Sequence, residues 1–280
     1  MPSSSSPSSA PRFDFDIDDY LNPFVPRPRL KLLPKPISRL LGYRSTPQEP
    51  IGNLLVCIWA FIGAFAGISL ISLLFHFLPV RGPSDPPIII ASFGASAILE
   101  YNSISSPLAQ PRNVIFGQAF SSIIGVAITN AFQLSDDFEN LRWLAGALAV
   151  ATASAFMGLT KTLHPPAGAT ALLAATTPQI TDLGWFLVPL ILLGTVVMLL
   201  VACVVNNIQR QFPLYWWTEH DLSSLQAGSA GVEKEASVLP VDDAEHAIRV
   251  TGREIIVPDS VTLTNEETKL LQALKGRLRV

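Results

Sequence analysis

Residues 53–78 read NLLVCIWAFIGAFAGISLISLLFHFL, a run of 26 residues in which no Lys, Arg, Asp or Glu occurs. A helix needs about 20 apolar residues to cross the hydrocarbon core of a bilayer. This run is therefore predicted to form a membrane-spanning helix. Three further apolar runs of sufficient length follow, at 113–134, 141–163 and 183–206.

Charge is scarce throughout the middle of the chain. Only 10 Lys, Arg, Asp and Glu residues lie between positions 51 and 206, whereas about a quarter of the residues in a soluble domain are charged. An ionised side chain at the bilayer centre costs roughly 2.5–3.5 kcal/mol. The sequence therefore excludes a soluble enzyme and predicts a multi-pass membrane protein, with the lipid bilayer as its partner.

The chain divides into three parts. Residues 1–50 are rich in Ser and Pro and bury too little apolar surface to offset the entropy of ordering, so we expect a mostly disordered N-terminal arm. Residues 51–206 form the transmembrane domain. Residues 207–280 are a polar C-terminal tail, predicted to hold a short strand within 248–257 and a short helix after 264. Cys57 and Cys203 lie inside apolar runs, so neither a disulfide, a metal site nor a cofactor is indicated.

Two shorter apolar stretches open with paired prolines. Pro86-Pro87 leads to Leu99, and Pro165-Pro166 leads to Thr177. Proline is tolerated in the first turn of a helix but not in its interior. Each stretch is predicted to be a half-length or re-entrant helix that begins at its prolines. The fold class is thus all-α, with four long spanning helices and two short Pro-initiated helices arranged as two related halves.

The two halves of the core resemble each other in three places that occur in the same order. Residues 64–69 (AFAGIS) match 155–160 (AFMGLT), residues 94–99 (GASAIL) match 168–173 (GATALL), and residues 124–126 (IGV) match 193–195 (LGT). This order predicts an internal repeat. The alternative is shared composition, because small residues recur wherever membrane helices pack closely.

The number of membrane crossings depends on the two short stretches. If both cross fully, the chain crosses six times and the halves are inverted; if both are re-entrant, it crosses four times and the halves are parallel. Either model places both termini on one side. Basic residues concentrate on the cytoplasmic side of membrane proteins, and the six-crossing model collects Arg112, Lys161 and Arg210 with the basic residues of the arm. We therefore favour six crossings and cytoplasmic termini.

The sequence from His164 to Thr170, HPPAGAT, is the strongest candidate for a functional site. Two prolines followed by small residues end one helix, start another and are expected to leave free backbone N–H groups at the new N-terminus. A helix N-terminus attracts anions, and short broken helices mark the substrate site in many transporters. The predicted substrate contacts are His164, Pro166, Ala167, Gly168, Ala169 and Thr170. A purely structural role for His164 in a tight turn is the alternative.

Further polar residues provide secondary candidates. Ser96 is the counterpart of Thr170 in the first half, although helix packing also explains its small neighbours. Arg112 and Asn113 open the next long helix, where they can attract an anion; Asn113 can instead cap the helix, and Arg112 can pair with Glu100. Gln118 lies one to two turns inside that helix and should face protein or a cavity rather than lipid.

Three of these segments resemble the signature blocks of the HPP family, which is named for its His-Pro-Pro motif. They are residues 92–97 (SFGASA), 106–114 (SPLAQPRNV) and 164–171 (HPPAGATA). The family is described as integral membrane proteins with four spanning helices, and plant plastid relatives are regarded as nitrite transporters. The resemblance therefore implies that this chain moves a small, nitrite-like inorganic anion. Many relatives have His at the position of Gln118, so a proton-carrying role for that imidazole is not implied here.

Residues and resemblance together predict a membrane transporter or channel, not an enzyme, whose substrate site lies at the short helices. Two alternatives remain. One is a non-transporting scaffold or sensor that binds partners through its arm and tail. The other is a membrane-embedded enzyme that uses His164 as an acid or base, although no carboxylate partner lies on the same segment. The predictions include no nucleic-acid partner, and a homo-oligomer is compatible with the sequence.

Overall fold

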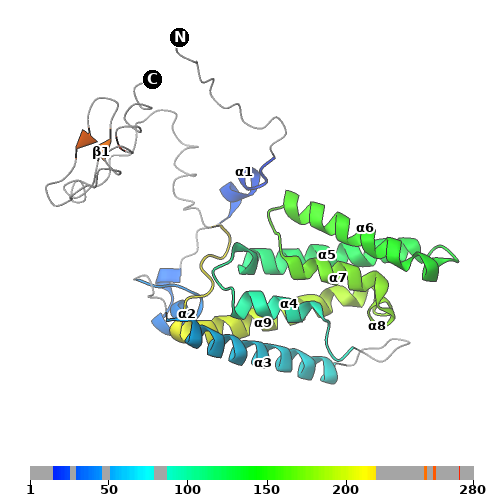
Figure 1. The fold of residues 1–280 in the computed structure, drawn as a ribbon, viewed down its shortest axis with the longest axis horizontal. Helices are drawn as coiled ribbons and strands as arrows, with labels where there is room; N and C mark the ends of the chain where they lie inside the picture. The colour runs from blue at the N-terminus through cyan, green and yellow to red at the C-terminus, as the bar shows by residue number, and fades with distance from the viewer. Residues whose placement is uncertain are drawn as a thin grey trace, which may run out of the picture. The chain divides into compact units, whose positions relative to one another are not determined.

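The computed structural model describes residues 15–25, 30–45, 51–78, 87–218, 249–250, 255–256 and 271. It is built from helices (Figure 1). The membrane domain contains the helices α3 (Asn53–Phe77), α4 (Ser92–Tyr101), α5 (Pro111–Phe132), α6 (Phe138–Leu159), α7 (Pro165–Thr176), α8 (Pro178–Thr181) and α9 (Leu187–Gln209), with 3-10 turns η3 (Pro107–Ala109) and η4 (Gly184–Phe186).

Four of the described helices are long and apolar enough to cross a membrane, namely α3, α5, α6 and the unit of η4 and α9. They confirm the four spanning helices expected from the sequence. Large apolar side chains lie on the outside of α3, where Phe61 is 72% and Phe65 68% exposed. An apolar surface of this kind is unfavourable in water, and it fits a helix that faces lipid.

The contacts of α3 give its direction relative to α4 and α9. Near the end of α3, the ring of Phe75 packs edge-on against Phe93 at the start of α4 (6.2 Å between centroids). Tyr101, at the end of α4, instead reaches Gly63 in the first half of α3. Near the start of α3, Trp59 donates a hydrogen bond to Gln209 at the end of α9 (2.8 Å). Both α4 and α9 therefore run antiparallel to α3.

The contacts of α5 give its direction relative to α6 and α7. Gly117 and Gly125 of α5 lie against His164 and Ala171. Because these contacts follow the same order along both segments, α5 and α7 run parallel. The short connection from α5 to α6 makes that pair antiparallel. Ser92 and Ser96 of α4 contact Thr170 and His164 in the opposite order, so α4 and α7 run antiparallel. Helices α3, α5 and α7 therefore run one way, and α4, α6 and α9 run the other. We call the face at which α3 begins and α9 ends the arm side, and the opposite face the far side.

The two short helices are too short to cross a bilayer by themselves. At a rise of 1.5 Å per residue, the 10 residues of α4 and the 12 residues of α7 extend for about 15 and 18 Å, against a hydrocarbon thickness of about 30 Å. Helix α7 begins at Pro165 as predicted. Helix α4 begins at Ser92, so the expectation that it starts at Pro86-Pro87 is wrong. Pro87 lies outside any helix.

Small residues let α4 approach its neighbours. A Cβ atom at Gly63 would lie 2.5 Å from Cδ1 of Tyr101, and one at Gly67 would collide with the hydroxyl of the same residue. On α9, a Cβ atom at Gly194 would collide with the ring of Phe93. Both large rings are fully buried. The glycines therefore make room for the aromatic side chains that hold α4 between α3 and α9.

The described part of the N-terminal arm forms short helices that contact the membrane domain. They are α1 (Asp18–Leu21), η1 (Asn22–Phe24), η2 (Leu30–Leu32) and α2 (Lys35–Leu40). Arg39 and Arg44 donate hydrogen bonds to the carbonyl oxygens of Ile208 and Arg210 at the end of α9 (3.1 and 2.9 Å). The expected disorder therefore does not hold for these segments, because basic side chains satisfy the free carbonyl groups at a helix C-terminus.

The chain separates into two compact units, residues 1–226 and 227–280. In the second unit the structure describes two paired strands, β1 (Arg249–Val250) and β2 (Ile255–Ile256), which fall inside the segment predicted to be β-prone. Most of the helix predicted after residue 264 lies outside the described residues. The first unit extends past residue 206. The N–H of Leu214 donates to Oε1 of Gln110 in the membrane domain, and the indole N–H of Trp216 donates to the carbonyl oxygen of Leu41 in the arm.

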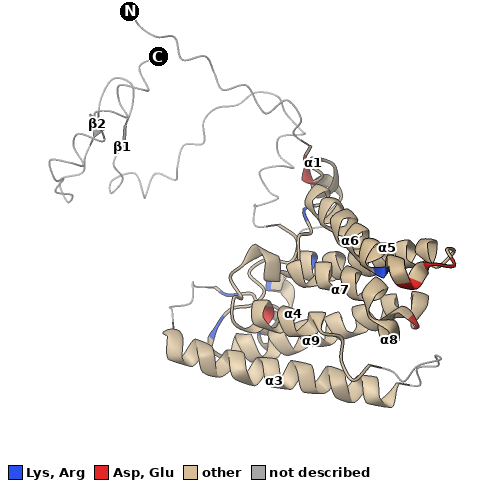
Figure 2. Cartoon of the chain, turned by 45° about the vertical axis from the view of Figure 1, so that its right-hand side comes forward, with Lys and Arg blue, Asp and Glu red and all other residues tan. Residues whose placement is uncertain are grey.

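Charged residues lie mainly at the two ends of the helix bundle (Figure 2). The far side carries acidic residues at the α5–α6 connection and beside α8. The arm side carries most of the described basic residues: Lys31, Lys35, Arg39, Arg44, Arg112, Lys161 and Arg210. The bundle between these ends is almost free of charge.

Candidate functional site

His164 joins three segments at the place where the two short helices meet. It precedes α7, its Nε2 lies 3.1 Å from Oγ of Ser96 on α4, and its Nδ1 lies 2.9 Å from the carbonyl oxygen of Leu108 in η3. A carbonyl oxygen only accepts, so Nδ1–H is the donor to Leu108 and, in the neutral ring, Nε2 accepts the hydrogen bond of Ser96. Both ring nitrogens are therefore occupied within the protein.

Thr170 forms a second polar contact one and a half turns further along α7. Its Oγ1 lies 2.7 Å from Oε1 of Gln118 on α5 and 2.9 Å from Oγ of Ser92 on α4. The side chains of Ser92, Ser96, Gln118, His164 and Thr170 are at most 1% exposed. We call these five residues the central polar cluster. The sequence predicted three of them as site residues, and the structure brings those three together with Ser92 and Gln118.

One donor of the central polar cluster has no hydrogen-bond partner among the described residues. Nε2 of Gln118 is buried and makes no hydrogen bond to any described residue. A buried polar group left unpaired costs about 1–3 kcal/mol. The site therefore holds a preformed N–H donor that a ligand with an acceptor oxygen would satisfy.

The expectation of free backbone N–H groups at the start of α7 is wrong. Pro165 and Pro166 have no N–H, and the N–H of Ala167 donates to the carbonyl oxygen of His164 (2.9 Å). Proline at the first positions and a tight first turn thus leave few uncommitted amides. In this site, side chains supply the available hydrogen-bond donors.

The remaining predicted residues of the His-Pro-Pro segment face in different directions. Pro166 and Ala167 are buried, whereas Gly168 and Ala169 are partly exposed. A Cβ atom at Gly168 would meet no atom within 4 Å. Gly168 and Ala169 therefore lie away from the contacts made by His164 and Thr170.

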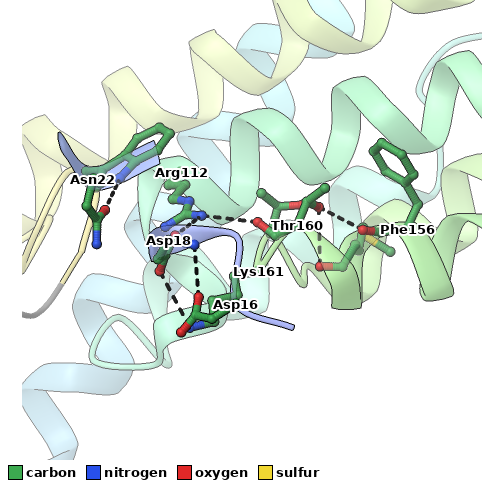
Figure 3. Close-up of polar contacts among 10 residues, drawn as sticks. Asp16, Asp18, Asn22, Arg112, Phe156, Thr160 and Lys161 are labelled. Carbon is green, nitrogen blue, oxygen red and sulfur yellow. Dashed lines mark hydrogen bonds and ion pairs between the residues drawn. The ribbon is translucent and has the colours of Figure 1, made fainter. Parts of the chain in front are cut away.

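Arg112 lies on the arm side, in contact with the N-terminal arm rather than with Glu100 (Figure 3). Its Nη2 lies 2.6 Å from Oδ1 of Asp18 and donates to the carbonyl oxygen of Thr160 (3.1 Å). The guanidinium also lies over the ring of Trp217, with its Cζ 4.3 Å from the ring centroid. The predicted pairing of Arg112 with Glu100 is therefore wrong. Trp217, in the segment after α9, covers this arginine.

Asn113 links α5 to the turn that leads into His164. Its Nδ2 donates to the carbonyl oxygen of Leu163 (3.0 Å). Helix α5 already begins at Pro111, with Gln110 at the N-cap position. Asn113 thus positions the turn and does not cap the helix.

Lys161 adds a second cation beside Arg112, in the turn between α6 and α7. Its Nζ lies 2.5 Å from Oδ2 of Asp16 and 3.8 Å from Oδ2 of Asp18. The hydrogen bond to Asp16 raises the pKa of Lys161 and lowers the pKa of Asp16. Asp16 and Asp18 of the arm thus form ion pairs with Arg112 and Lys161 of the membrane domain.

Glu100 is a buried carboxyl group that sequence reasoning did not single out as a site. It is 0% exposed, and neither of its carboxyl oxygens makes a hydrogen bond to a described residue. Ser92, Ser96 and Glu100 recur at every fourth residue of α4, a spacing that places them along one side of a helix. This spacing is the feature of the sequence from which Ser92 could have been predicted as a neighbour of Ser96 in the site. For Gln118, the corresponding feature is a polar side chain inside an apolar run.

The described residues contain no group of three or more His, Cys, Asp and Glu side chains able to hold a metal ion. The polar groups brought together are hydroxyls, an amide and an imidazole. These groups bind by hydrogen bonding, and they suit a small polar ligand that carries oxygen atoms.

Alternating apolar helices that enclose a buried polar cluster define a polytopic helical membrane protein. Residues 49–213 match the model of the HPP transmembrane region, which covers more than half of the chain. The chain belongs to the HPP family. The expected family assignment is confirmed.

Two curated relatives are transmembrane proteins of Dictyostelium discoideum. One is 37% identical over 181 residues, which cover 63% of this chain and 61% of the relative. The other is 36% identical over 163 residues, covering 57% of this chain and 50% of the relative. The chain thus spans about half to three fifths of the length of these relatives. No solved structure gives a significant match.

Proposed function

We propose that this protein is a transporter or channel for a small inorganic anion, and that the anion passes through the central polar cluster. The observation that carries this proposal is the unpartnered Nε2 of Gln118, buried where α4, α5 and α7 meet. In an apolar surrounding, an N–H donor without an acceptor is unfavourable, and an anion with oxygen atoms supplies the missing acceptor.

Hydroxyl groups around Gln118 support the same ligand chemistry. Among the described residues, the hydroxyls of Ser92, Ser96 and Thr170 contact only one another, His164 and Gln118. A hydroxyl proton rotates freely, so these groups can turn from their protein partners to an entering anion. No fixed positive charge lies in the cluster itself. Binding is therefore expected to be weak, as conduction through a membrane requires.

We propose further that the domain consists of two inverted halves, α3–α4–α5 and α6–α7–α9, in a six-crossing arrangement. The alternating helix directions support this reading. So do the matched glycines, because Gly125 on α5 packs against Ala171 on α7, and Gly194 on α9 packs against Phe93 on α4. Gly94 and Gly168, which correspond in the two halves, both have open space at the Cβ position. In inverted-repeat transporters the substrate site lies at the interface of the repeats.

The arm side is proposed to face the cytoplasm. Most of the described basic residues lie there, while Asp136 and Asp137 in the α5–α6 connection and Asp182 after α8 lie on the far side. The positive-inside tendency then places the described arm and the segment after α9 in the cytoplasm.

The proposal is tested by anion uptake into proteoliposomes, measured for nitrite, nitrate, formate and chloride. We expect uptake of at least nitrite above that of protein-free liposomes. Gln118→Met keeps the side-chain size but removes the amide, and a hydrogen bond to a charged ligand is worth about 1.5–3 kcal/mol. Uptake should therefore fall by roughly 10- to 100-fold.

Gln133→Met is the matched control, because Gln133 is the exposed C-cap residue of the same helix. It should transport like the wild type. Equal uptake by the two variants, or the absence of uptake of every anion by the wild type, would contradict the proposal.

A membrane-embedded hydrolase is the second candidate, because Ser96 and His164 form a hydrogen-bonded pair of the kind that activates a nucleophile. We place it second for a structural reason. Nucleophilic serines of hydrolases lie on sharp, exposed turns, whereas Ser96 lies in the middle of α4 and is 1% exposed. A hydrolase would not show the anion uptake described above.

A further inference from the structure

Two basic residues on the arm side form a positively charged pair that contacts carboxylates of the same chain. Arg112 at the start of α5 is 4% exposed, and Lys161 lies beside it in the α6–α7 turn. Their partners are the carboxylates of Asp18 and Asp16 from the arm (Figure 3). Nε of Arg112 is buried and has no hydrogen-bond partner among the described residues. The guanidinium therefore has donor capacity beyond what the arm uses.

Lys161 occupies a backbone position that normally belongs to glycine. Its φ is 52°, and its N–H bonds Gly158 O while the N–H of Thr162 bonds Met157 O (3.3 and 3.0 Å). This is a Schellman ending of α6, whose left-handed residue is usually Gly. A lysine there strains the backbone, because the left-handed conformation brings Cβ close to the following carbonyl oxygen. A strained lysine at this position is explained by a function of its side chain. That side chain contacts the carboxylates of Asp16 and Asp18.

The same turn connects this charged pair to the central polar cluster. Arg112 donates a hydrogen bond to the carbonyl oxygen of Thr160. Asn113 donates one to the carbonyl oxygen of Leu163, the residue before His164. An anion bound between Arg112 and Lys161 would thus lie at the arm-side end of the segment that leads into the central polar cluster.

We propose that Arg112 and Lys161 form a binding site for small monoanions at the arm-side entrance, and that the carboxylates of Asp18 and Asp16 occupy it as internal ligands. A carboxylate has the bent O–X–O shape of nitrite and the same charge, so the arm and the transported anion compete for one site. The inference rests on the proposed function for the identity of the transported anion. The binding site itself is open to a separate test.

The test measures binding through Trp217, whose ring lies on Arg112. Iodide quenches tryptophan fluorescence on contact, and the contribution of Trp217 is obtained by comparison with Trp217→Phe in full-length protein in detergent. Asp18→Asn removes the charge of the internal ligand. We expect quenching of Trp217 by iodide to rise by roughly tenfold or more, and nitrite to compete with iodide. Asp16→Asn, at a more exposed position, should give a smaller rise.

Asp19→Asn is the matched control, because Asp19 lies in the same turn but is exposed. It should leave quenching unchanged. Lys161→Gly in the Asp18→Asn background should lower the raised quenching again, and it relieves the backbone strain, so loss of folding is not expected. If Asp18→Asn and Asp16→Asn both behave like Asp19→Asn, the inference is wrong.

Flux measurements separate the two proposals. If Asp18→Asn increases nitrite uptake, the result supports the proposal that the anion site is an entrance and that the arm closes it. Raised iodide quenching without uptake of any anion supports the binding site and contradicts the transport function. Uptake by the wild type that Asp18→Asn leaves unchanged, together with unchanged quenching, contradicts the entrance site alone.

Discussion

Gly117→Ala is expected to destabilise the protein strongly and to abolish anion uptake. A Cβ atom at this position would lie 2.7 Å from Cβ of His164 and 2.9 Å from the carbonyl oxygen of Thr162. Neither atom lies at the end of a flexible side chain, so the turn before α7 must move. Overpacking of this kind costs about 1–3 kcal/mol. The expected result is a lower thermal unfolding midpoint, together with loss of the His164–Ser96 contact.

Gly168→Ala is the control for this prediction. The added methyl group meets no atom within 4 Å, and Ala is favoured over Gly inside a helix by about 0.5–1 kcal/mol. The unfolding midpoint should stay the same or rise slightly. A Gly117→Ala variant as stable as Gly168→Ala would show that α5 does not pack against the turn in this way.

Cysteine labelling from the two sides of the membrane is expected to give an all-or-none result. In the six-crossing arrangement, Lys35→Cys in the arm and Ser103→Cys after α4 label from the same side, and Asp136→Cys after α5 labels only from the other. All three positions are exposed. The measurement uses an impermeant thiol reagent on sealed vesicles, in a background with Cys57→Ala and Cys203→Ala.

A four-crossing arrangement predicts a different pairing. Helix α4 would then re-enter without crossing, so Lys35→Cys and Asp136→Cys would share one side and Ser103→Cys would lie on the other. That outcome would contradict the inverted halves, and with them the proposed position of the substrate site between the repeats.

Much of the membrane domain was predictable because hydropathy and helix length act locally. The run at 53–78 and the three later runs each exceed the length that a spanning helix needs, so α3, α5, α6 and α9 were expected within a few residues. The start of α7 at Pro165 also follows from local chemistry, since proline fixes φ and lacks an N–H. The start of α4 did not follow from its prolines, because Pro87 is separated from Ser92 by residues outside the helix.

The candidate site was predicted in part, because contacts between distant segments leave little trace in one sequence. The motif pointed to His164, Thr170 and Ser96, and the structure brings these together. It also commits both nitrogens of His164 to Leu108 and Ser96, which makes that residue a positioning group. The free donor on Gln118 depends on the geometry of three helices and was not predictable from spacing.

The contacts of the N-terminal arm were also not predictable from the sequence. Its composition is typical of disordered chains, yet Asp18 pairs with an almost fully buried arginine. Composition reports whether a segment can bury its own apolar core. It does not report that a charged group elsewhere in the fold provides a partner for the segment.

The most direct test of the central claim is modification of Ser96→Cys during transport, in the background with Cys57→Ala and Cys203→Ala. Ser96 lies in the central polar cluster, in hydrogen-bond contact with His164. If the anion passes this point, a small charged thiol reagent should modify the cysteine in proteoliposomes and stop nitrite uptake, and saturating nitrite should slow the modification. Complete modification with undiminished uptake, or a cysteine that stays unmodified while nitrite is taken up, would contradict the account.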